Sequence, residues 1–484
     1  MLQERALVHL THARFDEALA DLAQAELEPE FVASSSHAFH RGYALRCLGR
    51  HHESIAAMTR AIELDPSNLN ARSSRASSHF ALQLFEAAID DYSSAIELAT
   101  AALPELASTA ATLYNNRGLA RAYAAHALSS TLADFSEAIR LAPTNASFLN
   151  NRGSALLNHR RFLEAEQDFS RAIALIDSSA TVRLNRGNAL VALGRHGDAI
   201  HDFDAAIRLD PTLVSAFLAR AHAYQHLDLH ESAIDDFTHV LCQCSATTNT
   251  SNSKNATVIA ALNGRGVSKG SLGQHQAALR DLCEALRLDS TDALLLNNRG
   301  LVYHALECFG EAIEDFSSAI YKSKEPPIKA FLNRAAAYAS LQRYADAAND
   351  LSEVLYLEPA NLEALYNRAL ANAALELHQD AVADLTQLLH HVPYDQPERL
   401  VANQLALVVS ALHARSISYS RLGKQQEASV DTAAATNLEP MLSITPSPRA
   451  PVATATATAT ATPTAAEVSN GTSNTSTEHS SGII

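Results

Sequence analysis

Small and apolar residues recur at helical spacing along Asn185–Pro211, whose sequence is NRGNALVALGRHGDAIHDFDAAIRLDP. The pattern runs from Ala189 to Leu193, breaks at Gly194, resumes from Ala199 to Ile207 and ends at Pro211. This predicts two short helices joined by a turn. A helix of this length with one apolar side is not stable alone in water. Neighbouring parts of the chain must therefore cover both helices.

The same unit repeats along most of the chain. Its most regular position is an arginine that precedes a small residue, as Arg186 precedes Gly187. Successive arginines lie 34 to 47 residues apart, and most spacings are 34 or 35 residues. We call these residues the ladder arginines: Arg5, Arg41, Arg75, Arg117, Arg152, Arg186, Arg220, Arg265, Arg299, Arg334, Arg368 and Arg415. Repeats of this kind bury their apolar faces against one another in a single array.

A helix-turn-helix unit of this period, closed by a proline, resembles the tetratricopeptide repeat. The matching positions are Gly187, Ala199, Phe203, Ala206 and Pro211. The resemblance implies an all-α fold, a right-handed α-solenoid of about twelve helix-turn-helix repeats. It extends over residues 1–440. The chain departs from the family in one position, because arginine stands where the family usually has leucine.

Three longer spacings mark insertions near residues 99–111, 243–257 and 394–404. We expect the first to be a lengthened helix that is interrupted at Pro104. The second contains the polar run Ser245–Thr257, which predicts an irregular surface loop. The C-terminal tail, residues 441–484, is rich in Thr, Ala, Ser and Pro, and we expect it to be disordered.

Charge and composition limit the classes of binding partner and the cellular compartments that we expect. The formal net charge is −16, which disfavours nucleic acid or an anionic membrane surface as the main partner. The five cysteines are scattered and odd in number, which is typical of a reducing compartment. No apolar run reaches transmembrane length, and no signal peptide precedes the first repeat. We expect an intracellular, cytoplasmic protein; the nucleus, the cilium and the oligomeric state are left open.

The sequence contains no pattern typical of a catalytic or metal centre. Gly264, Arg265 and Gly266 resemble a phosphate-binding loop only briefly, and their place in the repeat indicates glycines that pack helices. His222 and His226 have a spacing that can bind zinc, but no third ligand is placed beside them. We therefore expect no enzyme activity, no cofactor and no metal.

An aspartate follows nearly every ladder arginine at a constant distance. It stands sixteen residues later, as Asp202 does after Arg186, and seventeen residues later at Asp134. Ala57 is the exception. A guanidinium in a leucine position requires such a partner, since a partly buried unpaired charge is costly. We predict an internal series of Arg–Asp pairs that fixes the register of the helices. Arginines lining a groove for acidic peptides are the alternative.

Asparagines precede the ladder arginine in two groups of three repeats. In the tetratricopeptide family this position faces a concave groove, and the pattern is similar to the asparagine ladder of O-linked N-acetylglucosamine transferase, where such side chains hold a peptide backbone. The resemblance implies a peptide-binding site at Asn116, Asn151, Asn185, Asn298, Asn333 and Asn367, with Ser154, Asn188 and His222 beside it. Asparagine is also common here in ordinary family members, so a purely structural role stays open. Of the basic residues that a carboxylate clamp needs, only Lys329 lies near its expected position, so we do not expect clamp binding of acidic C-terminal tails.

The resemblance implies a non-enzymatic scaffold for protein–protein interaction, which binds extended peptides or partner helices in its groove. The alternative is a substrate-recruiting module of a transferase or other enzyme whose catalytic domain is missing or on another chain.

Overall fold

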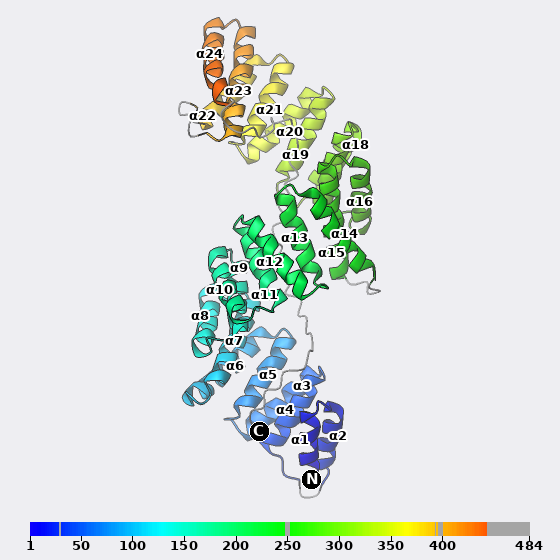
Figure 1. Cartoon of the computed structure of the whole chain (residues 1–484), viewed down its shortest axis with the longest axis vertical. Helices are drawn as coiled ribbons and strands as arrows, with labels where there is room; N and C mark the ends of the chain where they lie inside the picture. The colour runs from blue at the N-terminus through cyan, green and yellow to red at the C-terminus, as the bar shows by residue number, and fades with distance from the viewer. Residues whose placement is uncertain (29–30, 247–251, 393, 395–399, 443–484) are drawn as a thin grey trace. The chain divides into compact units, whose positions relative to one another are not determined.

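The computed structural model describes residues 1–28, 31–246, 252–392, 394 and 400–442. These residues form 24 helices and no strand, and consecutive helices pair into twelve repeats (Figure 1). The predicted all-α fold of repeated helix pairs is thereby confirmed. The tail beyond Leu442, with the disorder expected there, lies outside the described residues.

The described residues divide into two compact units. The first unit, Met1–Ala223, contains α1 (Leu2–Thr11), α2 (Phe15–Ala25), α3 (Ser35–Cys47), α4 (His51–Leu64), α5 (Leu69–Ala81), α6 (Phe85–Ala101), α7 (Ala107–Tyr123), α8 (Leu128–Leu141), α9 (Ala146–Asn158), α10 (Phe162–Leu175), α11 (Ala180–Ala192) and α12 (His196–Leu209). The boundary falls within α13 (Val214–His226).

The second unit begins at Tyr224 and contains α14 (His230–Ala246), α15 (Asn252–Ser271), α16 (His275–Leu288), α17 (Ala293–Ala305), α18 (Phe309–Lys322), α19 (Ile328–Ser340), α20 (Tyr344–Leu357), α21 (Leu362–Ala374), α22 (His378–His391), α23 (Ala402–Arg421) and α24 (Gln425–Leu442). Odd-numbered helices are the first helix of a repeat, and even-numbered helices are the second.

One backbone conformation closes the first helix of every repeat. The eighth residue after each ladder arginine has a positive φ, between 55° and 75°. This left-handed residue ends the helix and turns the chain back along it. Glycine, which adopts this conformation without strain, fills only four of the twelve positions: Gly49, Gly194, Gly273 and Gly423.

The core of each repeat lies between its two helices. The aromatic position of the second helix is fully buried at Phe135, Phe169, Phe203, Phe237 and Phe316. Alanines of the second helix, such as Ala199 and Ala206, are also fully buried and let the helices approach closely. The apolar positions that predicted the repeat are therefore the positions that hold each helix pair together.

The insertions lengthen helices. α7, α15 and α23 follow the three insertions, and they contain 17, 20 and 20 residues, against 13 in most first helices. For the second insertion the prediction of an irregular loop is wrong in part, because α14 continues to Ala246 and α15 begins at Asn252. Extending an existing helix costs little compared with starting one, so polar residues next to a helix continue it. For the first insertion, the break around Pro104 lies between two 17-residue helices, α6 and α7.

Candidate functional site

The predicted asparagines lie on first helices that contact one another directly. α7 contacts α9 and α9 contacts α11 in the first unit, and α15, α17 and α19 are in contact in the same way in the second. The first helices α7, α9 and α11 thus form one layer, and α15, α17 and α19 form another. Asn116, Asn151 and Asn185 belong to the first of these layers, Asn298 and Asn333 belong to the second, and Asn367 lies on α21.

Four of these six asparagines donate a hydrogen bond to another asparagine in the preceding repeat. The Nδ2 atom of Asn151 lies 2.9 Å from Oδ1 of Asn115, and Nδ2 of Asn185 lies 2.9 Å from Oδ1 of Asn150. The same contact joins Asn298 to Asn263 and Asn333 to Asn297, each at 2.8 Å. We call these four contacts the inter-repeat amide pairs.

The amide pairs follow a rule that could be found in the sequence. The acceptor asparagine stands two residues before a ladder arginine, and the donor stands one residue before the next ladder arginine. At Ala219 and Gly264, which interrupt the series of asparagines, the first position of the preceding repeat is leucine, Leu184 or Leu218; leucine also stands there before Asn367, at Leu332. Our sequence analysis noted both positions but not their correlation across repeats.

An amide in such a pair still has hydrogen-bonding capacity. Its nitrogen carries two N–H donors and its carbonyl oxygen is an acceptor. Asn151 and Asn185 use one N–H in the pair, and their second N–H and carbonyl oxygen make no hydrogen bond to described residues. Both residues are half-buried, whereas Asn298 is only 7 % exposed. The arrangement therefore holds Asn151 and Asn185 in place with a donor and an acceptor to spare, and encloses Asn298.

Asn116 and Asn367 begin and end the series without such a pair. Asn116 accepts a hydrogen bond from Asn115 at 3.1 Å and contacts the phenol of Tyr92. Asn367 makes no hydrogen bond to described residues and is half-buried.

The series is interrupted at Gly264 for a steric reason. A Cβ atom placed on Gly264 would lie 2.2 Å from the ring of Phe237 on α14. No side chain fits there, so asparagine is excluded from this repeat.

The neighbouring positions differ between the two units. Ser154 donates its hydroxyl to the carbonyl of Asn150 at 2.9 Å, and Asn188 and His222 are half-buried. The corresponding positions of the second unit are apolar: Val267, Leu301, Ala336, Leu370 and Ile417. Leu370 is 42 % exposed and Ile417 is 61 % exposed. In the first unit this position is therefore mixed, with Leu119 in the repeat of Asn116 and polar residues in the repeats of Asn151 and Asn185, whereas in the second unit it is apolar.

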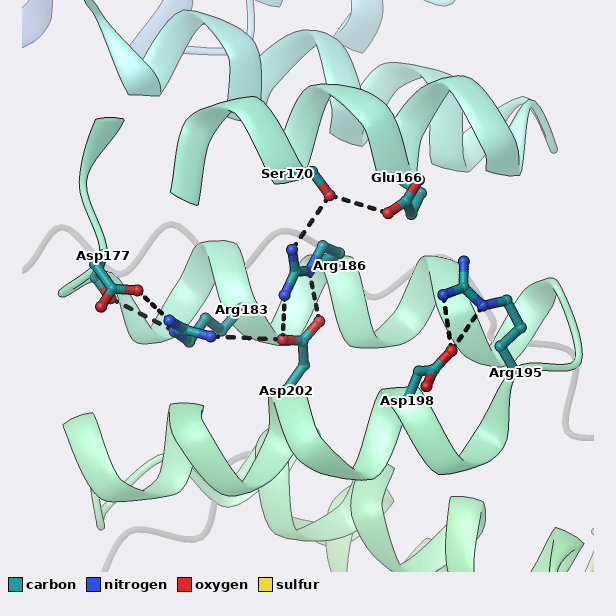
Figure 2. A network of polar contacts seen from close by, with 8 residues as sticks. All are labelled: Glu166, Ser170, Asp177, Arg183, Arg186, Arg195, Asp198 and Asp202. Carbon is teal, nitrogen blue, oxygen red and sulfur yellow. Dashed lines mark hydrogen bonds and ion pairs between the residues drawn. The ribbon is translucent and has the colours of Figure 1, made fainter. Parts of the chain in front are cut away.

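The predicted Arg–Asp pair forms in at least ten repeats of the described part of the chain. Figure 2 shows one of them, in which Nε and Nη2 of Arg186 each lie 2.7 Å from a carboxylate oxygen of Asp202. The aspartates are 3–6 % exposed, so their carboxylates are largely removed from water. Nine other pairs are Arg5–Asp21, Arg75–Asp91, Arg117–Asp134, Arg152–Asp168, Arg265–Asp281, Arg299–Asp315, Arg334–Asp350, Arg368–Asp384 and Arg415–Asp431.

The third nitrogen of the ladder arginine reaches the preceding repeat, a contact that sequence reasoning missed. In Figure 2, Nη1 of Arg186 donates to Ser170 of α10 at 3.2 Å, and Ser170 donates to Glu166 at 2.9 Å. The partners in other repeats are Thr59, Ser93, Ser136, Asp204, Thr238, Cys283, Ser317, Ser352 and Thr386. Apart from Ser136, each lies eighteen residues after the preceding ladder arginine. Each such arginine therefore joins two repeats, not only two helices.

The repeat without the aspartate uses a different carboxylate. Ala57 stands in the aspartate position, and Arg41 instead donates to both carboxylate oxygens of Glu26, at 2.6 and 2.7 Å. Glu26 also lies 3.0 Å from Nε2 of His37, which is buried. Burial raises the pKa of Glu26, but the hydrogen bonds from Arg41 and His37 outweigh it and leave the pKa below its usual value.

The ladder arginines stay charged. Hydrogen bonds that these residues donate to the aspartates raise the pKa of Arg152, Arg186, Arg334 and Arg415, while burial acts in the opposite direction. Their nitrogens are already occupied within the fold. The geometry supports the structural interpretation of these arginines and offers little to an acidic peptide.

Sequence models of one repeat family match the chain in four places. A model described as tetratricopeptide repeat matches residues 39–102, 121–180 and 332–395, and one described as TPR repeat matches residues 187–228. The chain is a multi-repeat tetratricopeptide repeat protein. As such it is a scaffold for protein interaction, and tetratricopeptide repeat proteins are generally not catalytic.

Two curated relatives align with the chain over a short stretch. Human "Sperm-associated antigen 1" is 32 % identical over 90 residues, which are 19 % of this chain and 10 % of that protein. Human "Serine/threonine-protein phosphatase 5" is 30 % identical over 90 residues, 19 % of this chain and 18 % of that protein. The chain thus spans less than a fifth of the length of either relative.

Solved structures that are similar include the APC/C hetero-tetramer Cut9–Hcn1, at 17 % identity over 85 % of this chain and 82 % of that chain, with a TM-score of 0.43. The P58(IPK) TPR domain is 17 % identical over 81 % of this chain and 99 % of that chain, with a TM-score of 0.34. None of the described helices of the tetratricopeptide array is both long and apolar enough to cross a membrane.

Proposed function

We propose that the protein binds extended peptide segments of partner proteins along the layer of first helices, through the side-chain amides of Asn116, Asn151 and Asn185 in the first unit. Asn333 and Asn367 serve the same role in the second unit, and Asn298 contributes less because it is buried. The observation that supports this most is the inter-repeat amide pair. It fixes an amide in each of several consecutive repeats and leaves it one N–H and one carbonyl oxygen.

The free N–H and the carbonyl oxygen of each amide can pair with the C=O and the N–H of one ligand residue. The carbonyl of a peptide residue accepts from the amide N–H, and its backbone N–H donates to the amide oxygen. Packed helices lie about 8–10 Å apart. An extended peptide advances about 3.3 Å per residue, so one amide meets roughly every third residue of the ligand. Backbone recognition of this kind ignores the ligand's sequence, and selectivity falls to neighbours such as Ser154, Asn188 and His222.

The test is a triple substitution in the full chain, Asn116→Ala, Asn151→Ala and Asn185→Ala. Each amide contributes about 1 kcal/mol net, so retention of a displayed library of random peptides should weaken by about a hundredfold. Asn158→Ala is the matched control, since Asn158 is an exposed asparagine at the end of α9. If the triple variant retains the library normally but melts early, the asparagines serve the fold, and the proposal is wrong.

A second candidate is a recruiting module for an enzyme on another chain. Its support is that one relative, Serine/threonine-protein phosphatase 5, is an enzyme of which the match covers 18 %. Proximity labelling with the full chain separates the two candidates. A reproducible catalytic partner favours the recruiting module, and a mixture of non-enzymatic proteins favours the scaffold.

A further inference from the structure

Arg46 stands apart from every other arginine in the described part of the chain. It lies near the end of α3, three residues after Tyr43, and its guanidinium carbon is 5.1 Å from the centre of the Tyr43 ring. His40 and Tyr43, and likewise Tyr43 and Arg46, are three residues apart, so each pair is adjacent on the helix surface. His40 occupies the position that carries asparagine in later repeats, and α3 contacts the first helix of the next repeat, α5.

Arg46 has no acceptor. Among the described residues it is the only half-buried arginine without a hydrogen bond or an ion pair, and its Nε atom is enclosed with no partner. By contrast, Arg41 on the same helix pairs with Glu26, and Arg75 on α5 pairs with Asp91. A buried donor without a partner is costly and calls for an explanation. Its two terminal nitrogens are not among the enclosed polar atoms and so keep access to solvent.

The surroundings of Arg46 supply no carboxylate. His51, at the start of α4, feels the charge of Arg46, and its Nδ1 atom is likewise enclosed without a partner. Burial, and then the charge of Arg46, lower the pKa of His51, which therefore stays neutral near pH 7. Tyr92 of α6 also feels this charge, but its hydroxyl already contacts Ser77. Within the described residues the site thus holds one fixed positive charge that nothing balances.

We propose that Arg46 binds the carboxylate of an aspartate or glutamate side chain in a peptide that lies along the first helices of the first unit. The ring of Tyr43 covers one face of the guanidinium and leaves its terminal edge exposed. That edge presents two parallel N–H donors, the geometry in which arginine forms a bidentate hydrogen bond with a carboxylate. The inference rests on the proposed function, because the peptide backbone must lie on the layer that contains Asn116, Asn151 and Asn185.

A carboxylate fits this site better than a phosphate. A phosphate group on a side chain carries nearly two negative charges, and the sites that bind it gather several arginines. Here there is one cation, with a neutral histidine beside it. A single negative charge balances the site and leaves no excess.

The test compares displayed random peptides in which one position is fixed as Glu or Asp with the same peptides fixed as Gln or Asn. We call the peptides fixed as Glu or Asp the acidic set and those fixed as Gln or Asn the amide set. The full chain should retain the acidic set about tenfold better than the amide set. Arg46→Gln should abolish this difference and leave retention of the amide set unchanged. Arg60→Gln removes an exposed arginine that pairs with Glu63, and should behave like the unmodified chain.

Each outcome decides a separate question. If the amide set is retained through Asn116, Asn151 and Asn185 but the acidic set is not preferred, the Arg46 inference fails and the proposed function stands. If neither set is retained, both fail. A third set fixed as phosphoserine should bind no better than the glutamate set, and a clear preference for it would overturn the carboxylate assignment.

Thermal melting gives an independent check. Arg46→Met removes a charge with no partner in the fold, so the melting temperature should stay constant or rise. A fall of several degrees, like that expected when a paired ladder arginine is removed, would show that Arg46 serves the fold.

Discussion

The glycine that follows several ladder arginines leaves room for a ring of the second helix. A Cβ atom on Gly187 would lie 2.4 Å from the ring of Phe203, and Gly153 and Gly300 face Phe169 and Phe316 in the same way. Where the second helix carries leucine instead, as at Leu351 and Leu385, the small residues are Ala335 and Ala369. The correlation is not strict, because Gly266 faces Leu282, and alanine stands in the repeat of Phe237, at Ala221.

One repeat contains a matched pair of glycines that tests this packing. Gly187→Ala forces the Phe203 ring aside and should destabilise the protein by about 1–3 kcal/mol. Gly197, near the start of α12, has no atom within 4 Å of a new Cβ, so Gly197→Ala should be neutral or stabilising by a few tenths of a kcal/mol, up to about 1. Urea unfolding of both variants measures the difference. Equal losses would mean that backbone freedom, not the ring, determines the glycine at position 187.

Which single-residue contacts could be predicted depends on how many repeats they involve. The Arg186–Asp202 pair lies within one repeat, and a constant separation of sixteen residues predicted it. The contact from Arg186 to Ser170 crosses into the preceding repeat, and serine, threonine, cysteine and aspartate all serve as the partner. A position defined by hydrogen-bonding ability rather than by residue type gives a weak signal in one sequence.

At the scale of helices, a ladder arginine holds three together: its own, the second helix of its repeat and the second helix of the preceding repeat. Arg334 on α19 contacts Asp350 on α20 and Ser317 on α18. Arg186 does the same, but its partner Asp202 also lies 3.6 Å from Arg183. Asp202 therefore has a second cation nearby, and no second cation is paired with Asp350 among the described residues.

This difference predicts unequal effects of the same substitution. Arg334→Leu leaves Asp350 buried and unpaired and should destabilise the protein by about 3 kcal/mol. Arg186→Leu should cost less, because Arg183 remains beside Asp202. Combining Arg334→Leu with Asp350→Leu should cost much less than the sum of the single changes. Chemical unfolding of the four variants measures these values, and additive losses of a few tenths of a kcal/mol would show that the pairs are solvated.

The junction of α2 and α3 predicts a local response to acid. The pKa of Glu26 is lower in the folded protein than in the unfolded chain, so its contribution is present above the unfolded pKa and is lost as the pH falls through the folded pKa. Below about pH 4, amide hydrogen exchange in α2 and α3 should speed up relative to α9. Glu26→Gln should reduce this local acid response, and an unchanged response would assign it to another group.

The limits of the helices next to the insertions were hard to predict from the sequence. The run around Asn252 is polar, and composition alone favours a loop. It is joined to the strongly patterned helix around Arg265, however, and a helix already formed there extends into it. Composition describes a segment by itself and cannot account for the helix that adjoins it.

For the whole molecule, the end of the array can be located by its packing. The prediction placed the boundary at residue 440, but α24 continues to Leu442, and Met441 and Leu442 pack against the last core cluster. The arrangement of the two units could not be predicted, because each repeat mainly contacts its neighbours and a repeated pattern specifies only those local contacts.

Two truncations differing by two residues test this boundary. Removing residues 443–484 should leave the melting temperature within about a degree, whereas removing residues 441–484 also removes two packed side chains and should lower it. Differential scanning calorimetry measures both. A large drop with the shorter truncation would show that the tail packs on the last repeat.

The inter-repeat amide pairs limit how such an array can be rearranged. A repeat with asparagine at the acceptor position, such as Asn150, needs a following repeat with asparagine at the donor position, such as Asn185. A repeat with Leu218 precedes Gly264, where no side chain fits. Neighbouring repeats must therefore match at the acceptor and donor positions. A hybrid that receives one transplanted repeat must also receive the matching residue of the adjacent repeat. Duplication of blocks of repeats preserves these junctions, whereas shuffling of single repeats would break them.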